Sequence, residues 1–371
     1  MKLLYLIAGT YRAAGMEKVL ADKANWFAAH GHEVVIVTTD QRGQEPAFAM
    51  DPSIRQIDLG INYEETNGRN FLVKALAFPF KQLRHKRALK RLLNREKPDI
   101  TVSMFCNDAG FLPKIQDGSK KVLEVHFSRF KRLQYGRKGL WALADKFLSD
   151  RDAEYVRAFD RFVVLTQEDK DYWGDLPNMV VIPNGVPRKE PAPLEAHTVI
   201  AVGRYSFQKA LDRLIQAWAE IEDRGDWKLK LVGDGECRDE LTTLINDLGL
   251  YDTVELAGVQ KDMESVYRNA SILALSSRYE GLPMVLLEAE SYGIPSVSFD
   301  CQCGPKDVIR DGENGRLVPN GNVDALARVL SETMHDPEAI RRMGAAAWED
   351  ALRWEPETIM QQWLNLFEGL L

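Results

Sequence analysis

Short apolar runs alternate with segments of helical periodicity along nearly the whole chain, and this alternation limits the possible folds more than any other feature. Near the start, KLLYLI and EVVIVTT have strand length and flank GMEKVLADKANWFAAHG, in which Gly31 suits the position after a helix end. The alternation restarts after residue 197 with TVIAVG, LKLVG, TVELAG, SILALSS and IPSVSF. Strands that alternate with helices at this spacing form a parallel sheet covered on both faces. We therefore predict an α/β protein.

A chain of 371 residues is too long for one ordinary core, because domains usually have roughly 100 to 200 residues. The linker between two domains is predicted where prolines are most frequent, at positions 177, 183, 187, 191 and 193. We expect an N-terminal domain over 1–183 and a second domain from residue 184. Both are predicted to be doubly wound, and ligands of such sheets bind beyond the carboxyl ends of the strands. The cleft between the domains is thus the expected site.

The composition is that of a globular protein, since 45% of the residues are apolar and 28% are charged. No run approaches the roughly 18 apolar residues of a membrane span, and the first residues lack the cleavage site of a signal peptide. The four cysteines, at 106, 237, 301 and 303, form no CxxC pair and have no histidine cluster beside them. We therefore expect no structural zinc, no disulfide framework and a reducing, cytoplasmic location.

The stretch RYEGLPMVLLEAESYG, residues 278–293, combines two carboxylates with a helix start. SILALSS leads into it, and Pro283 suits the first position of the helix that follows. Free backbone N–H groups at that position could hydrogen-bond an anion or sugar hydroxyls. Glu288 has apolar neighbours. It is either a solvated position or a buried carboxylate that needs donors, such as the two hydroxyls of a ribose.

A second stretch, AVGRYSFQKALDRLI, places Arg204 and Lys209 five residues apart between a predicted strand and a predicted helix. Two solvated cations at a helix start are one explanation, although the helix dipole disfavours them. A bound diphosphate would reverse this penalty, because each charge-assisted hydrogen bond contributes about 1.5 to 3 kcal/mol. The pair alone leaves both explanations open.

Taken together, these stretches resemble the retaining GT-B glycosyltransferases of family 4, also called group 1, which transfer a sugar from a nucleotide sugar. The resemblance covers nearly the whole chain, through AAGMEKVL, VIPNGV, GRYSFQKALDRLI, YEGLPMVLLEAESYG and DVIRDGENGRLV. CQCGPKDVI is similar to a branch associated with bacterial surface-polysaccharide assembly. The family implies the GT-B fold, two Rossmann-like domains facing across a cleft. It also implies a donor domain over 184–353 and a final helix, 354–371, that crosses back to the N-terminal domain.

The resemblance implies a role for each residue around the nucleotide. Arg204, Lys209 and the backbone N–H of Gly15 would hold the diphosphate. Glu288 would bind the ribose hydroxyls. Val259, in GVQKDM after the strand-like TVELAG, would contact the nucleobase.

The resemblance also implies residues around the reacting carbon. Glu280 would face the transferred sugar, together with the backbone of Gly281, Leu282 and Pro283. His126 in VLEVHFSRF matches a family histidine that contacts the sugar or the acceptor, whereas the residue by itself would more often be structural. The chain departs from the family at Ala210, where glycine usually follows the phosphate-binding lysine. A methyl group is tolerable there if the backbone is helical.

The implied reaction is the transfer of a hexosyl unit, with retention of configuration, from a nucleotide sugar to a hydroxyl of a lipid-linked saccharide. The expected donor is a UDP-sugar. No cofactor and no metal are expected, since DRD at 150–152 lies in a helix-like charged segment and is explained by a solvated face. A nucleotide-sugar epimerase, which would act without an acceptor, and a non-catalytic nucleotide-sugar-binding protein are the alternatives; the Glu-x7-Glu spacing favours the transferase. A dehydrogenase is not expected, because VGDGEC has only the first two glycines of GxGxxG.

Basic residues are concentrated in the N-terminal half, where 1–183 carries 29 Lys and Arg against 23 Asp and Glu. The segment 69–97 holds ten of these cations among Phe and Leu residues, and 128–141 adds more cations and aromatics. A solvated helix or a nucleic-acid surface are alternatives, but the chain as a whole is acidic. A basic amphipathic helix also suits an anionic membrane. We expect peripheral association with the inner face of the cell membrane, and no nucleic acid.

Overall fold

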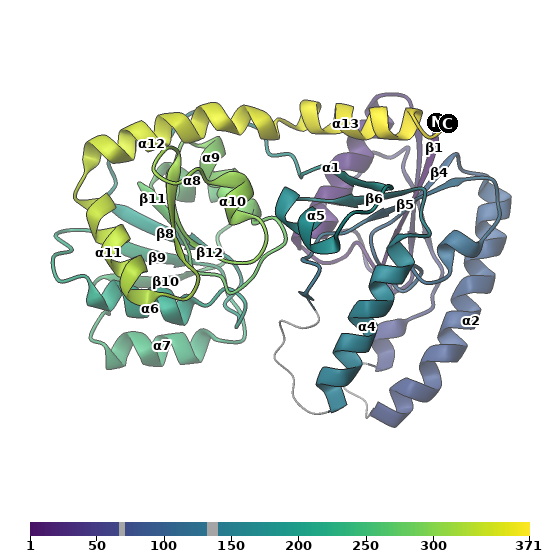
Figure 1. Cartoon of the computed structure of the whole chain (residues 1–371), viewed down its shortest axis with the longest axis horizontal. Coiled ribbons are helices and arrows are strands. Elements are labelled where there is room, and N and C mark those ends of the chain that lie inside the picture. The colour runs from purple at the N-terminus through teal and green to yellow at the C-terminus, as the bar shows by residue number, and fades with distance from the viewer. Residues whose placement is uncertain (67–70, 132–139) are drawn as a thin grey trace. The chain divides into compact units, whose positions relative to one another are not determined.

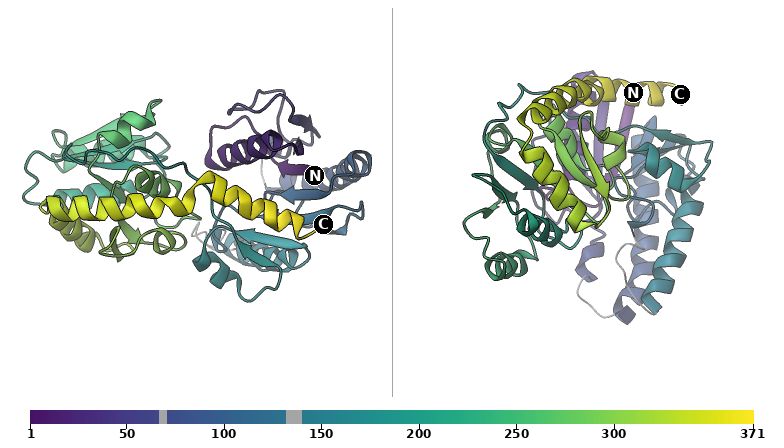
Figure 2. Two further views of the ribbon diagram at one scale, coloured as in Figure 1. Left: turned by 90° about the horizontal axis from the view of Figure 1, so that it is seen from above. Right: turned by 60° about the vertical axis from the view of Figure 1, so that its left-hand side comes forward.

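The computed structural model describes residues 1–66, 71–131 and 140–371 and divides into two compact units. Unit 1 comprises Met1–Leu165, Lys170–Ile182 and Met360–Leu371, and unit 2 comprises Thr166–Asp169 and Pro183–Ile359. Each unit is built on one parallel sheet with helices on its faces (Figures 1 and 2). The prediction of an α/β protein with two doubly wound sheets is therefore confirmed.

The sheet of unit 1 has seven parallel strands in the order β3-β2-β1-β4-β5-β6-β7. These are β1 Lys2–Ile7, β2 Glu33–Thr38, β3 Arg55–Asp58, β4 Ile100–Ser103, β5 Lys120–Glu124, β6 Arg161–Val164 and β7 Met179–Val181. Helices cover both faces, which explains why the five residues after Lys2 in β1, LLYLI, are apolar and buried. The strand order reverses between β1 and β4, so the loops that follow these two strands are neighbours.

Strand β7 was not expected, because it lies inside the proline-rich stretch that the sequence analysis assigned to a linker. Its residues Met179–Val181 pair with β6 in parallel register, between Pro177 and Pro183. β7 is the last strand of the sheet, and an edge position tolerates flanking prolines because only one side needs N–H donors.

The helical segments before residue 174 are α1 Gly15–Ala29, η1 Tyr63–Thr66, α2 Phe71–Glu96, η2 Leu112–Lys114, α4 Leu140–Val156 and α5 Gln167–Trp173. Leu89 and Leu93 of α2 join the core on one face of the sheet. On the other face, Phe27 of α1 contacts Phe367 of the last helix, α13 (Pro356–Glu368), with 5.5 Å between ring centres. From Met360 onward, α13 therefore belongs to unit 1.

His85 is the buried polar anchor of α2. Its ring meets Phe111 edge-on at 5.0 Å, and Nδ1 lies 3.1 Å from the hydroxyl of Tyr63. Burial lowers the pKa of His85 to about 4, whereas an unfolded histidine titrates near 6.5. Between these values the unfolded chain binds a proton that the folded chain excludes. The free energy of unfolding should therefore fall by up to about 3 kcal/mol as the pH drops from 6.5 to 4.

Urea denaturation at several pH values between 4 and 7 measures this effect. The His85→Gln variant should lose less stability on acidification than the wild type, because glutamine does not titrate. His30→Gln is the matched control, since the His30 side chain is exposed. Identical pH dependence in the wild type and His85→Gln would show that His85 does not carry the loss.

The sheet of unit 2 has six parallel strands in the order β10-β9-β8-β11-β12-β13. These are β8 Thr198–Val202, β9 Lys228–Val232, β10 Val254–Gly258, β11 Ile272–Leu275, β12 Ser296–Asp300 and β13 Gly315–Pro319. The order reverses between β8 and β11, so ligand-binding loops are expected to follow these two strands.

The helical segments of unit 2 are α6 Leu211–Glu220, α7 Arg238–Asp247, α8 Met263–Arg268, α9 Met284–Ser291, α10 Pro305–Val308, α11 Val323–Met334, α12 Pro337–Asp350 and η3 Ala351–Trp354. Helix α6 illustrates why they form, because Leu211, Leu214, Ile215 and Trp218 recur at helical spacing and are all buried in the core. In the part of the chain that the structure describes, no helix is long and apolar enough to cross a membrane.

Candidate active site

The loops that follow β8 and β11 meet at the switch point of the unit 2 sheet. Ser276 Oγ donates to the carbonyl oxygen of Lys209 (3.0 Å), and the N–H of Arg278 donates to the carbonyl oxygen of Gln208 (2.8 Å). Gln208 Nε2 donates in turn to the carbonyl oxygen of Tyr279 (3.0 Å). These three bonds fix the two loops against each other.

Lys209 and Glu280 form an ion pair across these loops. Lys209 Nζ lies 2.7 Å from Glu280 Oε1, and only 7% of Glu280 is exposed. Ser277 Oγ donates to the same oxygen (2.5 Å), and Gln208 Nε2 lies 3.4 Å from Oε2. A buried carboxylate would be costly without such partners. Since an ammonium group has three N–H donors, Lys209 can bond Glu280 and a second anion at the same time.

Glu288 lies in the second turn of α9 and is half-buried. Its Oε2 accepts a hydrogen bond from the hydroxyl of Tyr267 in α8, and the Tyr267 ring stacks on Tyr292 at 5.1 Å. Burial raises the pKa of Glu288, while the Tyr267 bond and the charge of Lys209 oppose the rise. Among the described residues, Oε1 of Glu288 has no hydrogen-bond partner, so it is left as an acceptor.

Tyr267 is a site residue that the sequence analysis missed. Tyr267 lies in MESVYRNA, between the strand-like TVELAG and SILALSS, and a tyrosine there carries no signal of its own. In the structure, Tyr267 is 2% exposed. Its hydroxyl, in α8, donates to Glu288 in α9, although the two residues are 21 positions apart in the chain. Only the fold brings such a pair together.

The loop that leads into α9 corrects one detail of the prediction. Pro283 has φ −72° and ψ 96°, so it is the residue before the helix, and Met284 is the first helical residue. The loop after β12 packs tightly on this turn: a Cβ at Gly304 would lie 2.3 Å from Pro283 Cδ and 3.0 Å from the carbonyl oxygen of Gly281. Gly304 therefore lets the neighbouring loop support Gly281, Leu282 and Pro283 from behind.

Arg204 forms an ion pair with Glu236, whereas Lys209 forms one with Glu280. The Arg204 side chain is 73% exposed, and Nη2 lies 3.0 Å from Glu236 Oε2 in the loop after β9. An exposed ion pair of this kind stabilises a fold by less than about 1 kcal/mol. The guanidinium of Arg204 is therefore free to leave Glu236 for a stronger anion.

The two glycines of VGDGEC, Gly233 and Gly235, pack directly against the backbone of the 203–210 loop. A Cβ at Gly233 would lie 2.0 Å from the carbonyl oxygen of Gly203, and one at Gly235 would lie 2.3 Å from that of Tyr205. Both distances are too short for any side chain. The sequence analysis considered these glycines only in order to exclude a dehydrogenase, but their function is to let the loops after β8 and β9 touch backbone to backbone.

The backbone conformation of Ala210 differs from the helical one that the sequence analysis expected. The methyl group was expected to be tolerated on helical backbone, yet Ala210 has the left-handed angles φ 49° and ψ 42° and caps the start of α6. Left-handed backbone costs a residue with a Cβ about 1 to 2 kcal/mol. Glycine would avoid this strain, which gives the family preference a physical reason.

Val259 follows β10 and is 73% exposed. In the strand order, β10 is separated from β8 by β9, which corresponds to about 10 Å at the usual strand spacing. Val259 is thus on the same edge of the sheet as Lys209 but two strands away. The structure shows no direct contact between them.

Gly15 and His126 belong to unit 1 and lie at the carboxyl edge of its own sheet. Gly15 is the first residue of α1, and a Cβ added to it would meet nothing within 4 Å. His126 follows β5, its side chain is 8% exposed, and its Nε2 lies 3.0 Å from Glu124 Oε1. Burial raises the pKa of Glu17 in the first turn of α1, and its own backbone N–H and the charges of Arg12 and His126 oppose the rise.

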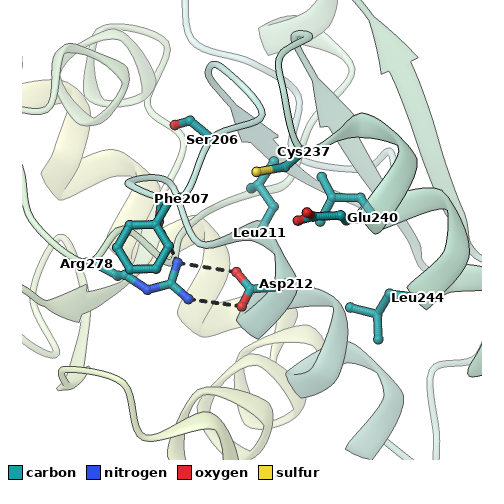
Figure 3. Close-up of a pocket in the computed structure, with 9 residues that line it drawn as sticks. Ser206, Phe207, Leu211, Asp212, Cys237, Glu240, Leu244 and Arg278 are labelled. Atoms are coloured by element: carbon teal, nitrogen blue, oxygen red, sulfur yellow. Dashed lines mark hydrogen bonds and ion pairs between the residues drawn. The ribbon is translucent and has the colours of Figure 1, made fainter. Parts of the chain in front are cut away.

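A separate pocket lies between α6 and α7, and residues of the two loops form part of its wall (Figure 3). Its walls include Phe207, Asp212, Cys237, Glu240 and Arg278. The Arg278 guanidinium stacks on the Phe207 ring at 4.1 Å and pairs with Asp212 at 3.0 Å, so its charge is already neutralised. With two carboxylates on its walls, this pocket suits a diphosphate less well than the Lys209 site does.

Family models match the chain from residue 13 to residue 350. The model described as Glycosyltransferase Family 4 matches residues 13–190, and the model described as Glycosyl transferases group 1 matches residues 186–350. The two models together cover every strand of both sheets except β1.

Individual relatives agree with these models. The chain is 34% identical over 219 residues to the amylovoran biosynthesis glycosyltransferase AmsD of Erwinia amylovora, which covers 56% of this chain and 62% of AmsD. It is 36% identical over 223 residues to an exopolysaccharide phosphotransferase of Streptomyces coelicolor, covering 58% of this chain and 24% of that protein. The chain thus spans less than two thirds of either relative. The crystal structure of Anabaena Alr3699/HepE in complex with UDP has the same fold, with a TM-score of 0.75 over 100% of both chains and 18% identity.

Proposed function

We propose a donor, an acceptor and a location for this chain, which belongs to the retaining glycosyltransferases of family 4 and has the GT-B fold. The donor is a UDP-sugar that supplies a hexosyl unit. The acceptor is a hydroxyl of a lipid-linked saccharide, and the product is part of a bacterial surface glycan. The observation that carries the proposal is the ion pair of Lys209 and Glu280 at the switch point of the unit 2 sheet.

The donor is supported by the chemistry of the unit 2 loops. Lys209 offers a cation to the diphosphate, and Arg204 offers a second one once it leaves Glu236. Oε1 of Glu288 is an acceptor for a ribose hydroxyl. Val259 presents exposed apolar surface further along the same sheet edge, where a nucleobase would lie. HepE, whose fold is the same, was solved with UDP bound.

The reaction would break the bond between the anomeric carbon and the diphosphate, and form a bond from that carbon to the acceptor oxygen on the same face. The acceptor proton passes to a phosphate oxygen of the leaving group. Lys209 and Arg204 stabilise the negative charge that the diphosphate gains. Glu280 is already bonded by Lys209 and Ser277, so it is held as a hydrogen-bond acceptor for the sugar hydroxyls rather than as a free nucleophile.

Substitutions of the two glutamates should separate these roles. Glu280→Gln is expected to lower the turnover number by about 100-fold with little change in the Kd for UDP, because Glu280 acts on the sugar. Glu288→Ala should instead weaken UDP binding by about tenfold or more, because a ribose hydroxyl loses its acceptor. Steady-state kinetics and isothermal titration with UDP measure the two effects. The reverse pattern would contradict the assigned roles.

The acceptor is supported by the relatives, since AmsD is named for amylovoran biosynthesis and the Streptomyces protein is named an exopolysaccharide phosphotransferase. Incubating the chain with a UDP-sugar panel, with and without lipid-linked saccharide, tests the assignment. We expect UDP release that depends on the acceptor. Conversion of the donor to an isomer without any acceptor would support an epimerase instead. UDP binding without any turnover would support a non-catalytic binding protein.

The location is supported by the exposed face of α2. Leu76, Phe80 and Leu83 are 71%, 75% and 46% exposed and share one side of the helix at spacing i, i+4 and i+7. Exposed cations accompany them at Arg84, Lys86, Arg87, Lys90 and Arg91. Basic charge beside exposed apolar side chains is the pattern by which a helix lies on an anionic membrane surface. Within the other basic segment, 128–141, residues 132–139 lie outside the described part of the chain, as do residues 69 and 70 of the first segment, 69–97.

Liposome flotation tests this location. The wild type should float with vesicles that contain phosphatidylglycerol and remain unbound with phosphatidylcholine alone. Replacing both Phe80 and Leu83 by serine should abolish flotation, whereas Tyr251→Ser, which removes a side chain 70% exposed in unit 2, should not. Equal flotation with both kinds of vesicle would contradict the proposal.

A further inference from the structure

A buried lysine faces a buried glutamate inside unit 1. Lys23 comes from α1 and Glu124 from the end of β5, and their side chains are 4% and 1% exposed. Lys23 Nζ donates to Glu124 Oε1 and also lies 3.7 Å from the centre of the Trp363 ring in α13. Burial alone would raise the pKa of Glu124, but the charge of Lys23 opposes this most strongly, His126 adds to the effect, and the pKa falls to about 2. The carboxylate is therefore ionised in the core.

His126 shares this carboxylate. It is two residues beyond Glu124, just after the end of β5. His126 Nε2 lies 3.0 Å from Oε1, the oxygen that Lys23 also bonds. Among the described residues, neither the other oxygen, Oε2, nor Nε2 of His126 has an aligned hydrogen-bond partner, so the approach of Nε2 to Oε1 is an electrostatic contact. Oε1 of Glu124 thus stands between a fixed cation and the imidazole.

Packing alone does not explain an ion pair at this position. Two apolar side chains of similar volume usually stabilise a core as well as a buried ion pair does, because the pair loses its hydration. The distinct effect of the carboxylate is on the histidine. A negative oxygen beside Nε2 favours the imidazole tautomer that carries its proton on Nε2. Nδ1 is then left as a hydrogen-bond acceptor.

We propose that Glu124 is a positioning residue for His126: it fixes the tautomer and orientation of the imidazole so that Nδ1 accepts a hydrogen bond from a hydroxyl of the bound saccharide other than the one that reacts. Lys23 supplies the countercharge, and Trp363 shields Lys23 from water. The inference rests on the proposed function and on the role that the family resemblance implies for His126, which is contact with the sugar or the acceptor. According to this inference, Lys23, Glu124 and Trp363 of α13 contribute to sugar transfer by positioning His126.

The variants must not leave one charge buried alone, since that would unfold the chain for an unrelated reason. The double variant Lys23→Met/Glu124→Gln removes both charges and keeps the side-chain volumes close to those of the wild type. Its thermal unfolding should stay within a few degrees of the wild type. Glu124→Gln alone should be less stable than the double variant, which verifies that the two charges compensate each other.

Nitrogen-15 NMR of histidine-labelled protein tests the tautomer directly. The chain has six histidines, and the His126 signals are assigned by their absence in His126→Gln. We expect Nε2 to be protonated and Nδ1 unprotonated in the wild type, and a mixture of tautomers in Lys23→Met/Glu124→Gln. The same ring-nitrogen shifts in both proteins would overturn the proposal.

Kinetics test whether the positioning matters. The double variant should lose about 10- to 100-fold in turnover number while its Kd for UDP stays within about twofold. Adding His126→Gln to it should cause little further loss, because Glu124 acts through that histidine. A turnover number near the wild-type value in the double variant would overturn the proposal, as would a full additional loss from His126→Gln. If the wild type transfers no sugar at all, the proposed function fails, and the NMR comparison still decides whether Glu124 orients His126.

Discussion

Replacing Lys209 with methionine is expected to lower the turnover number for sugar transfer by about 100- to 1,000-fold, the usual effect of removing one charge-stabilising donor from an active site. Lys209 is held between the loops after β8 and β11, 2.7 Å from Glu280, with further N–H donors available to a diphosphate. Methionine has a similar length but cannot donate. The leaving diphosphate would therefore develop its charge without the nearest cation.

Lys228→Met is the matched control for this prediction. Lys228 is an exposed lysine of the same unit, and its Nζ donates to the carbonyl oxygen of Asp252 (2.9 Å). This variant should keep turnover close to the wild type. Because Lys209→Met leaves Glu280 without its cation, Lys209→Met/Glu280→Gln should be measured as well, with thermal unfolding recorded for all variants. Wild-type turnover in a well-folded Lys209→Met protein would refute the assigned role.

Alanine at Gly233 is expected to lower the free energy of unfolding by about 2 to 6 kcal/mol and to abolish UDP binding. The added Cβ would lie 2.0 Å from the carbonyl oxygen and 2.8 Å from the carbonyl carbon of Gly203, and Gly233 has φ 139°. The obstructing atoms are backbone, so they cannot rotate away as a side chain could. The 203–210 loop would have to move, and with it Lys209.

Gly249→Ala separates steric collision from backbone strain. Gly249 also has a positive φ, 65°, but a Cβ there would meet nothing within 4 Å. Its alanine variant should therefore lose only the strain energy, about 1 to 2 kcal/mol, and bind UDP normally. Urea denaturation and UDP titration of both variants measure the difference. Equal effects at the two positions would mean that the close approach of Gly233 and Gly203 does not support the site.

The sheets and the loops that carry the site were predictable because local patterns encode them. Strands buried on both faces need continuous apolar runs, and helices need apolar residues at spacing 3 and 4, so the α/β alternation can be seen without coordinates. The motifs around Lys209 and Glu280 follow strand ends, and the reversal of strand order places those ends side by side. Strand β7 escaped notice because Pro177 and Pro183 flank only three strand residues.

Contacts between distant segments could not be predicted in the same way. Nothing local marks Tyr267 as the donor to Glu288, and nothing local shows that Ala210 has left-handed backbone. Lys23 is an instructive exception. It falls at helical spacing within the apolar stripe of α1, three residues after Leu20 and four before Phe27, so a buried charge could have been anticipated from the sequence. Its partner in β5 is 101 residues away in the chain and required the structure.

The most direct test of the account is a crystal structure of this chain with UDP bound. We predict that a phosphate oxygen lies within hydrogen-bond distance of Lys209 Nζ and that a ribose hydroxyl donates to Glu288. Arg204 should have left Glu236 for the diphosphate. UDP bound instead between α6 and α7, beside Phe207 and Arg278, with Lys209 still bonded only to Glu280, would contradict the account.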